Sequence, residues 1–131
     1  MRYFIVLLSI TLITFSCTKP NHTPEGPTDV RIRNITDQDF SNVFVDTGGG
    51  NHNYGNIAAG DETGYHRFEK AYPDAEVTVM INGEEYTTGK QDYTFATYIG
   101  PDKITYEVYI LNPGQKKLAV DIILEGPIED K

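Results

Sequence analysis

The sequence contains one cysteine and no tryptophan. The cysteine, Cys17, lies close to the N-terminus of a 131-residue chain, and none follows it. The rest of the chain therefore cannot form an internal disulfide, and its stability must come from a packed core. The absence of tryptophan weakens, without excluding, a role in sugar binding, since aromatic rings supply the stacking surface in such sites.

Basic residues are also scarce. Lysine and arginine total 11 against 19 aspartate and glutamate residues, so the formal net charge is −8. Nucleic-acid binding depends on neutralising phosphates with Lys and Arg, so a nucleic-acid partner is not expected. Adhesion to an anionic membrane surface through basic residues is disfavoured for the same reason. The excess negative charge favours solubility instead.

Residues for catalysis and metal binding are few. Ser41 is the only serine after Cys17, and no glycine elbow surrounds it. The histidines, His22, His52 and His66, lack the short spacing of a zinc site. We therefore predict no catalytic residue, no metal, no cofactor and no enzymatic activity.

The longest apolar run covers residues 3–15. A spanning helix needs about 20 apolar residues, so this run is too short for one and suits the hydrophobic region of a signal peptide. Arg2 supplies the positive charge that precedes such a region. We predict a signal peptide over residues 1–16, cleaved between Ser16 and Cys17.

The segment Thr14-Phe15-Ser16-Cys17 resembles the lipobox of bacterial lipoproteins, in a variant common in Bacteroidota. The resemblance implies that Cys17 carries a diacylglyceryl thioether and, after cleavage, an acylated amine, so that the membrane is a partner through lipid. The alternative is an ordinary secretory signal with a buried or free thiol at position 17. Ordinary cleavage requires small residues at two sites, which this region does not offer. Residues 17–29, polar and proline-rich, are then a flexible tether.

From residue 30 onward, short apolar alternations are separated by turn residues, which is typical of an all-β domain. We predict a single Ig-like or transthyretin-like antiparallel β-sandwich of about seven strands over residues 30–124, with a frayed tail at 125–131. Asn82-Gly83 predicts a type I′ hairpin turn. A strand is expected at 92–99, and Asn112-Pro113-Gly114-Gln115 predicts a type II turn.

Two features favour ligand binding. The first is a glycine-rich loop at 48–53, whose polar side chains Asn51, His52 and Asn53 are the candidate binding residues. The second is a set of tyrosines on expected neighbouring strands, whose rings could stack against sugars or a protein partner: Tyr86, Tyr93, Tyr98, Tyr106 and Tyr109.

The motifs Phe40-x-Asn42-Val43-x-Val45 and Tyr54-Gly55-x-Ile57, taken with the lipobox, resemble small lipoproteins of Bacteroidota. The resemblance implies membrane anchoring and a compact sandwich, and it supplies no catalytic residues. In such organisms acidic residues after the lipidated cysteine accompany surface display. Thr18-Lys19-Pro20-Asn21 lacks them, which favours an outer-membrane location facing the periplasm and leaves surface exposure open.

The main functional hypothesis is a lipid-anchored binding or structural domain without catalysis. One alternative is a glycan-binding accessory protein of the cell envelope. Another is an adhesin or assembly subunit, which would have an unpaired strand edge for its partner to complete. The least favoured is a hydrolase, which would need two carboxylates converging in a cleft.

Overall fold

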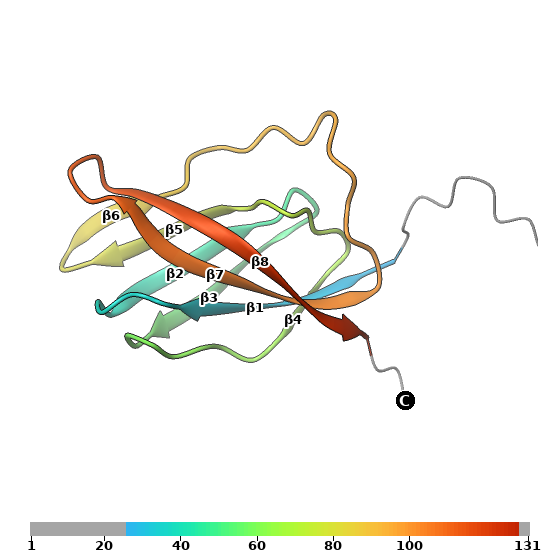
Figure 1. Cartoon of the computed structure of the whole chain (residues 1–131), viewed down its shortest axis with the longest axis horizontal. Coiled ribbons are helices and arrows are strands. Elements are labelled where there is room, and N and C mark those ends of the chain that lie inside the picture. The colour runs from blue at the N-terminus through green and yellow to red at the C-terminus, as the bar shows by residue number, and fades with distance from the viewer. Residues whose placement is uncertain (1–25, 129–131) are drawn as a thin grey trace, which may run out of the picture.

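The computed structural model describes residues 26–128, which form an all-β domain. Cys17, the signal peptide and most of the tether lie outside the described residues, as do residues 129–131. The strands, labelled in Figure 1, are β1 (Thr28–Asn34), β2 (Phe40–Asp46), β3 (Asn51–Ile57), β4 (His66–Phe68), β5 (Glu76–Ile81), β6 (Glu84–Thr87), β7 (Asp102–Asn112) and β8 (Lys117–Pro127).

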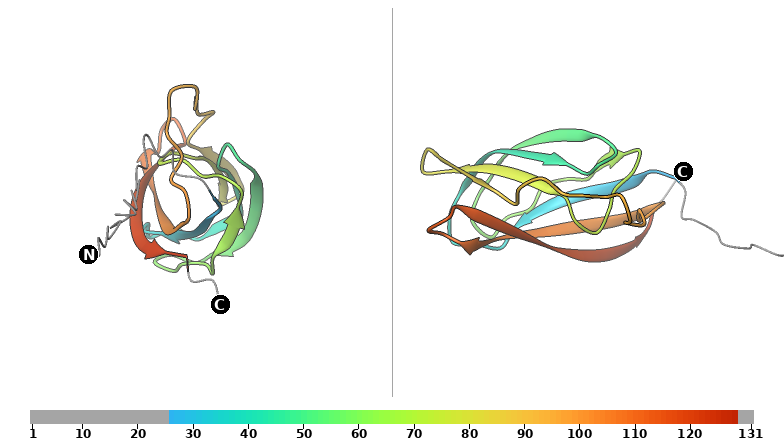
Figure 2. Two further views of the ribbon diagram at one scale, coloured as in Figure 1. Left: turned by 90° about the vertical axis from the view of Figure 1, so that its right-hand side faces the viewer. Right: turned by 90° about the horizontal axis from the view of Figure 1, so that it is seen from above.

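All eight strands belong to one sheet, in the order β3-β2-β5-β6-β8-β7-β1-β4. The sheet curls until its strands surround a common interior, so that it is nearly barrel-shaped when seen end-on (Figure 2). Two of its pairings, β1 with β7 and β6 with β8, are parallel. The all-β prediction is confirmed, whereas an antiparallel sandwich of about seven strands is not.

The sheet is weakest between β6 and β8. Only one residue pair, Thr87 with Lys117, joins these strands, whereas β7 and β8 pair along almost their full length. The sheet therefore consists of two halves, β3-β2-β5-β6 and β8-β7-β1-β4, linked by a single bridge at their junction.

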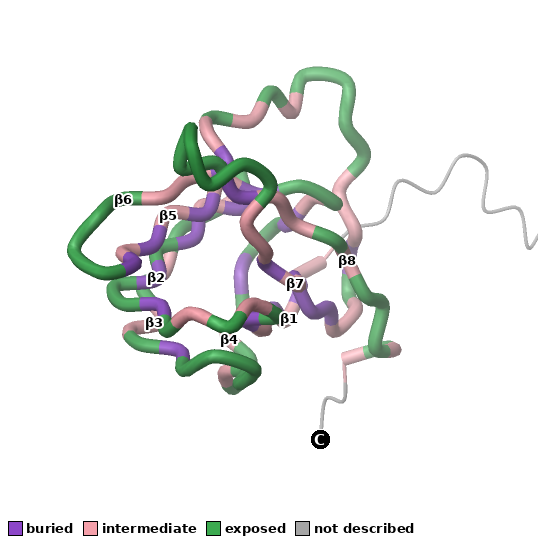
Figure 3. The backbone as a smooth tube through the Cα atoms, turned by 60° about the vertical axis from the view of Figure 1, so that its left-hand side comes forward, coloured by how far each residue is buried: buried purple, intermediate pink, exposed green. Residues whose placement is uncertain are grey.

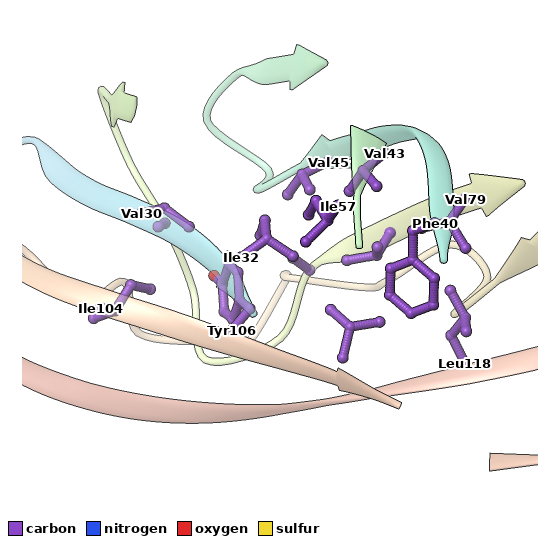
Figure 4. Packing of buried hydrophobic residues seen from close by; sticks show 14 of the residues in the cluster. Val30, Ile32, Phe40, Val43, Val45, Ile57, Val79, Ile104, Tyr106 and Leu118 are labelled. Carbon is purple, nitrogen blue, oxygen red and sulfur yellow. The ribbon is translucent and has the colours of Figure 1, made fainter. Parts of the chain in front are cut away.

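The two halves share one hydrophobic core, shown in Figure 4. In β1, alternate side chains such as Val30 and Ile32 are completely buried, as the period of a strand requires. In β2 a bulge shifts this period. Asn42 adopts a left-handed backbone with φ of 50°, which allows Phe40 and Val43 to face the same interior.

Asn34 fixes the end of β1. Its side chain is fully buried, and its amide nitrogen donates to the carbonyls of Gln38, Ile57 and Ala58. Its amide oxygen accepts from the backbone N–H and the hydroxyl of Thr36. One side chain thus holds three chain segments together, because a buried amide is stable only when its groups are hydrogen-bonded.

The structure confirms one of the two predicted turns and contradicts the other. Asn82 and Gly83 both have positive φ, 52° and 79°, as the predicted type I′ turn requires. The predicted type II turn at 112–115 is wrong. Gly114 lacks positive φ, and Lys116, with φ of 53°, donates its N–H to the carbonyl of Pro113 instead.

The strand predicted at 92–99 is also wrong. Residues 88–101 form one long connection between β6 and β7. Within it, the backbone N–H of Thr94 bonds the carboxylate of Asp92, and Ala96 donates to the carbonyl of Tyr93. These local bonds turn the chain back on itself, as an Asp side chain often does, and divert it from a sheet.

The domain limits differ from the prediction at both ends. β1 begins at Thr28, inside the expected tether, and β8 continues to Pro127, inside the expected frayed tail. Both extensions are held by β7, since Asp29 pairs with Lys103 and Pro127 pairs with Asp102. Among residues 26–128, no helix is long and apolar enough to cross a membrane.

Candidate functional site

A pocket of about 250 Å³ opens where the β6–β7 connection meets the segment between β4 and β5. Small-ligand sites are usually concave and combine apolar walls with a few polar groups, as this pocket does. It is lined by Tyr72, Pro73, Asp74, Gln91, Asp92, Tyr93, Ala96 and Thr97.

Stacked tyrosines hold the two walls together. The rings of Tyr72 and Tyr93 stack with centroids 4.4 Å apart and planes 19° apart. Tyr98 meets Tyr72 edge-on, with centroids 6.2 Å apart. Offset stacking and edge contacts are the favoured arrangements of aromatic pairs, so the connection is fixed against the body of the domain by its own rings.

Glycine makes room for one of these rings. A Cβ at Gly48 would lie 2.7 Å from the ring of Tyr93, and the φ of Gly48 is +85°. Both the space and the backbone conformation therefore require glycine. The hydroxyl of Tyr93 donates to the carbonyl of Asp46, which ties the connection to the end of β2.

The pocket is also supported from the core. Tyr106 is completely buried in β7, and its hydroxyl donates to the backbone carbonyl of Tyr72. The N–H of Ile99 donates to the carbonyl of Ala71 at 2.8 Å. These two hydrogen bonds hold the backbone at Ala71 and Tyr72, on one wall of the pocket, against β7 and the connection.

Hydrogen bonding and burial set the charges around the pocket. Hydrogen bonds from the hydroxyl and backbone N–H of Thr94 lower the pKa of Asp92, so this carboxylate is ionised at neutral pH. Burial, reinforced by the nearby Asp46, raises the pKa of Tyr93 to about 12, so its phenol stays protonated. The pocket therefore offers the carboxylate of Asp92 as an acceptor, beside the protonated phenol of Tyr93.

The tip of the connection presents an unpacked aromatic ring. Phe95, which lies between lining residues of the pocket, is 98% exposed. A large apolar side chain at a loop tip contributes nothing to the core, and loops are where binding residues concentrate. Phe95 is therefore the one ring near the pocket with both faces free to stack.

The candidate binding residues Asn51, His52 and Asn53 lie in β3, and not in a loop. The preceding glycines turn more tightly than expected, because Thr47 donates its N–H to the carbonyl of Gly50 and β3 begins at the next residue. Their role in binding stays a prediction.

His52 and His66, which lie on different strands, stack face to face with centroids 3.6 Å apart. This stack joins β3 to β4, the two edges of the curled sheet. The hydroxyl of Tyr54 crosses the same junction and donates to the carbonyl of Val30 at 2.6 Å. No group of three potential metal ligands occurs among residues 26–128.

The five tyrosines singled out in the sequence do not form one surface. Tyr93 and Tyr98 lie in the connection, whereas Tyr86 is in β6, Tyr109 is in β7 and Tyr106 is in the core. Sequence reasoning missed Tyr72, the central ring of the pocket. In the sequence, Pro73 directly after Tyr72 indicates that this tyrosine lies outside a regular helix or strand, in a connection where binding residues are common.

Comparisons with known proteins add little. No family model matches the chain, and no curated protein gives a significant match. Among solved structures, the chain is similar to a protein from Eubacterium rectale determined by NMR, with 16% identity and a TM-score of 0.46. The similarity covers 80% of this chain and 94% of that one.

Proposed function

We propose that this chain is a lipid-anchored protein of the cell envelope whose β-domain binds a ligand without transforming it. The anchor is Cys17, cleaved from Ser16 and held at the outer membrane facing the periplasm. The proposal of the anchor is supported by the short apolar run and the lipobox-like segment before Cys17. The proposal of binding is carried by the tyrosine-lined pocket.

The finer architecture is part of this proposal. The halves β3-β2-β5-β6 and β8-β7-β1-β4, joined by the single pair Thr87–Lys117, correspond to the two layers of an Ig-like or transthyretin-like sandwich. Because the shared core lies between them, each half has one buried face, as in packed sheets.

Binding is favoured over hydrolysis by the state of the acids. Two acids, Asp74 and Asp92, line the pocket. A glycosidase needs one acid whose pKa is raised so that it can protonate the leaving group. The pKa of Asp92 is lowered by its bonds to Thr94, which suits an acceptor for ligand hydroxyls.

A glycan is the ligand class that the pocket fits best. Sugars present hydroxyl donors to carboxylates and flat apolar faces to aromatic rings. Asp92 and Gln91 in the pocket lining supply polar contacts, and the exposed ring of Phe95, from the same connection, supplies an apolar face. We therefore propose a glycan as the ligand of this pocket, in line with the glycan-binding alternative.

The first test uses the full chain in mild detergent on a glycan array, followed by titration of any glycan that binds. Phe95→Ala should weaken binding between about twofold and tenfold, the usual value of one aromatic contact. Phe44→Ala is the matched control, since this ring is also exposed but lies on β2. Absence of binding to every glycan, or equal losses in both variants, would contradict a glycan site at the pocket.

The second test concerns the anchor. In a Gram-negative host, the wild-type chain should incorporate labelled palmitate and fractionate with membranes, and Cys17→Ala should do neither. A wild-type chain that takes up no label would contradict lipidation. Protease treatment of whole cells then separates the two orientations, because a periplasm-facing domain is cut only after the outer membrane is permeabilised.

A further inference from the structure

The outer edge of β8 is unpaired over most of its length. This strand runs for 11 residues and pairs with β7 along one edge. On its other edge, Lys117 alone pairs with β6, whose four residues end at Thr87. Within residues 26–128, no backbone hydrogen bond joins the connection 88–101 to the stretch 119–127. A row of backbone donors and acceptors is therefore open to solvent.

The usual protection of sheet edges is missing from residues 118–124, and a bulge occurs only beyond them, between Leu124 and Gly126. Natural proteins protect exposed edges with lysine, proline, bulges or short strands. From Leu118 to Leu124 the pairing with β7 has no register shift, and the stretch holds a single charged residue, Asp121. Proline appears only at Pro127, the last residue of the strand. Such an edge is a ready template for another strand.

The inward face of this edge is apolar and incompletely covered. Val120 and Ile122 pack partly against the core, but Leu124 is 68% exposed. Leu124 lies opposite Ile104, which is completely buried. The apolar face therefore starts in the core and continues into solvent along β8. Figure 3 colours most of the backbone at the end of this strand as exposed. A strand added at this edge would cover Leu124.

Residues 119–126 of β8 include no lysine or arginine, and Glu125 alone among their acids is paired, with Arg31 at 3.2 Å. Asp121 lies directly opposite Glu107, and like charges at such positions are destabilising. Glu107 is compensated by Arg33 at 2.9 Å, whereas Asp121 forms no ion pair or hydrogen bond with the residues that the structure describes. A basic side chain on an added strand would neutralise Asp121.

We propose that residues 119–126 of β8 bind an extended segment of another protein, which adds a strand to the sheet. The segment has aliphatic side chains at alternate positions, to cover the apolar face, and lysine or arginine between them, to meet Asp121. A second copy of this chain is disfavoured because each copy carries a net charge of −8. None of residues 119–126 lines the tyrosine pocket, so the inference extends beyond the proposed function.

The test uses the full chain in mild detergent and three short capped peptides labelled with a fluorophore. One alternates lysine and valine, one has the same composition in two blocks, and one alternates glutamate and valine. The alternating Lys/Val peptide should bind at least about tenfold more tightly than either of the others by fluorescence anisotropy. It should also slow hydrogen exchange at the amides of residues 119–126.

Two substitutions, each with a matched control, locate the site. Leu124→Lys should weaken binding about tenfold or more, because burial of the leucine is lost. Leu111→Lys, at a leucine that is 59% exposed near the end of β7, should leave binding unchanged. Asp121→Lys should weaken binding of the Lys/Val peptide by up to about fivefold and should strengthen binding of the Glu/Val peptide. Glu69→Lys, at an exposed acid outside β8, should do neither.

Three results would overturn the proposal. The first is the absence of preference for the alternating peptide over its block isomer. The second is protection of β3 amides instead of β8 amides. The third is a concentration-dependent dimer that Leu124→Lys abolishes, which would make the occupant a second copy. All four substituted positions are exposed, and far-UV circular dichroism on each variant ensures that lost binding reflects the surface and not unfolding.

Discussion

At the residue scale, the stacked histidines are the clearest pH-sensitive contact in the domain. Burial of His52 at the junction of β3 and β4, with the nearby ring of His66, lowers the pKa of His52. The other rings packed on the pair, Tyr54 and Phe68, carry no charge at neutral pH. Asp29 of β1 and Arg67 of β4 form an ion pair at 2.8 Å. The folded protein therefore disfavours protonation of His52.

This lowered pKa sets the sign of a stability change. Below the ordinary pKa of about 6.5, the unfolded chain binds a proton at His52 that the folded chain does not, so stability falls as the pH falls from about 7 toward 5. Urea unfolding at several pH values should show this slope in the wild-type protein, and His52→Gln should flatten it.

Asp92→Asn is the control for this measurement. The pKa of Asp92 is lowered by its bonds to Thr94, so its contribution to stability is present above about 3.8 and is lost below that value. The variant should keep the dependence of stability on pH between pH 7 and 5, and should change that dependence only near and below about pH 3.8. An unchanged slope in His52→Gln would show that the stack does not titrate in this window.

At the scale of elements, the curled sheet is closed by contacts that no strand pairing supplies. β3 and β4 meet through side chains, and the nearest backbone bridge joins Gly49 to Lys70. A Cβ at Gly49 would lie 2.4 Å from the Cβ of Lys70 and 2.8 Å from its carbonyl oxygen. The two backbones approach so closely that only glycine fits at this bridge.

Gly49→Ala should therefore destabilise the domain by about 1–3 kcal/mol, the usual cost of forcing extra atoms into a packed contact. Gly64→Ala is the matched control, because a Cβ at Gly64 meets nothing within 4 Å and its φ is not positive. Chemical denaturation of both variants measures the difference. Equal stability of the two variants would show that the bridge does not hold the edges together.

At the scale of the whole molecule, the weak junction between β6 and β8 raises the question of whether the two halves unfold together. One backbone pair links them, but Val45 of β2 and Val108 of β7 are both completely buried in the same core cluster. A shared core couples the halves more strongly than one hydrogen-bonded pair, so we expect a single cooperative transition.

Val45→Ala and Val108→Ala test this coupling from either side. Each should lower the free energy of unfolding by about 1–3 kcal/mol through the lost methyl groups. Because the chain has no tryptophan, tyrosine fluorescence follows the core, and far-UV circular dichroism follows the sheet. The two signals should coincide in both variants. Separate midpoints, or a variant that melts one half alone, would contradict a single folding unit.

The sequence predicted the elements that depend on local pattern. The alternation of Val77, Val79 and Ile81 places them in β5, and Asn82-Gly83 forms the expected turn. Local rules failed where a distant contact intervened. The aromatic stretch 92–99 has strand composition, but the ring of Tyr93 packs on Tyr72 and beside Gly48, which holds the chain out of the sheet.

In the candidate site, too, the sequence predicted only the residues that depend on local pattern. Tyr93 and Tyr98 were recognised as binding candidates, yet Tyr72 was not, because its partner lies in a distant segment. Asn51, His52 and Asn53 were assigned to a loop because glycines precede them. Whether β3 starts at Asn51 depends on its pairing with Asp46, and this pairing leaves no signature in the residues themselves.

By itself, the sequence determined the all-β character of the domain, its disulfide-free core and its excess of negative charge, since each follows from composition or from the period of a strand. It also carries the prediction of lipidation at Cys17. Only the tertiary structure decided that the strands form one curled sheet, that Tyr72 and Tyr93 meet at a pocket, and that β8 has an open edge. These features arise from contacts between residues far apart in the chain, which local sequence preferences do not encode.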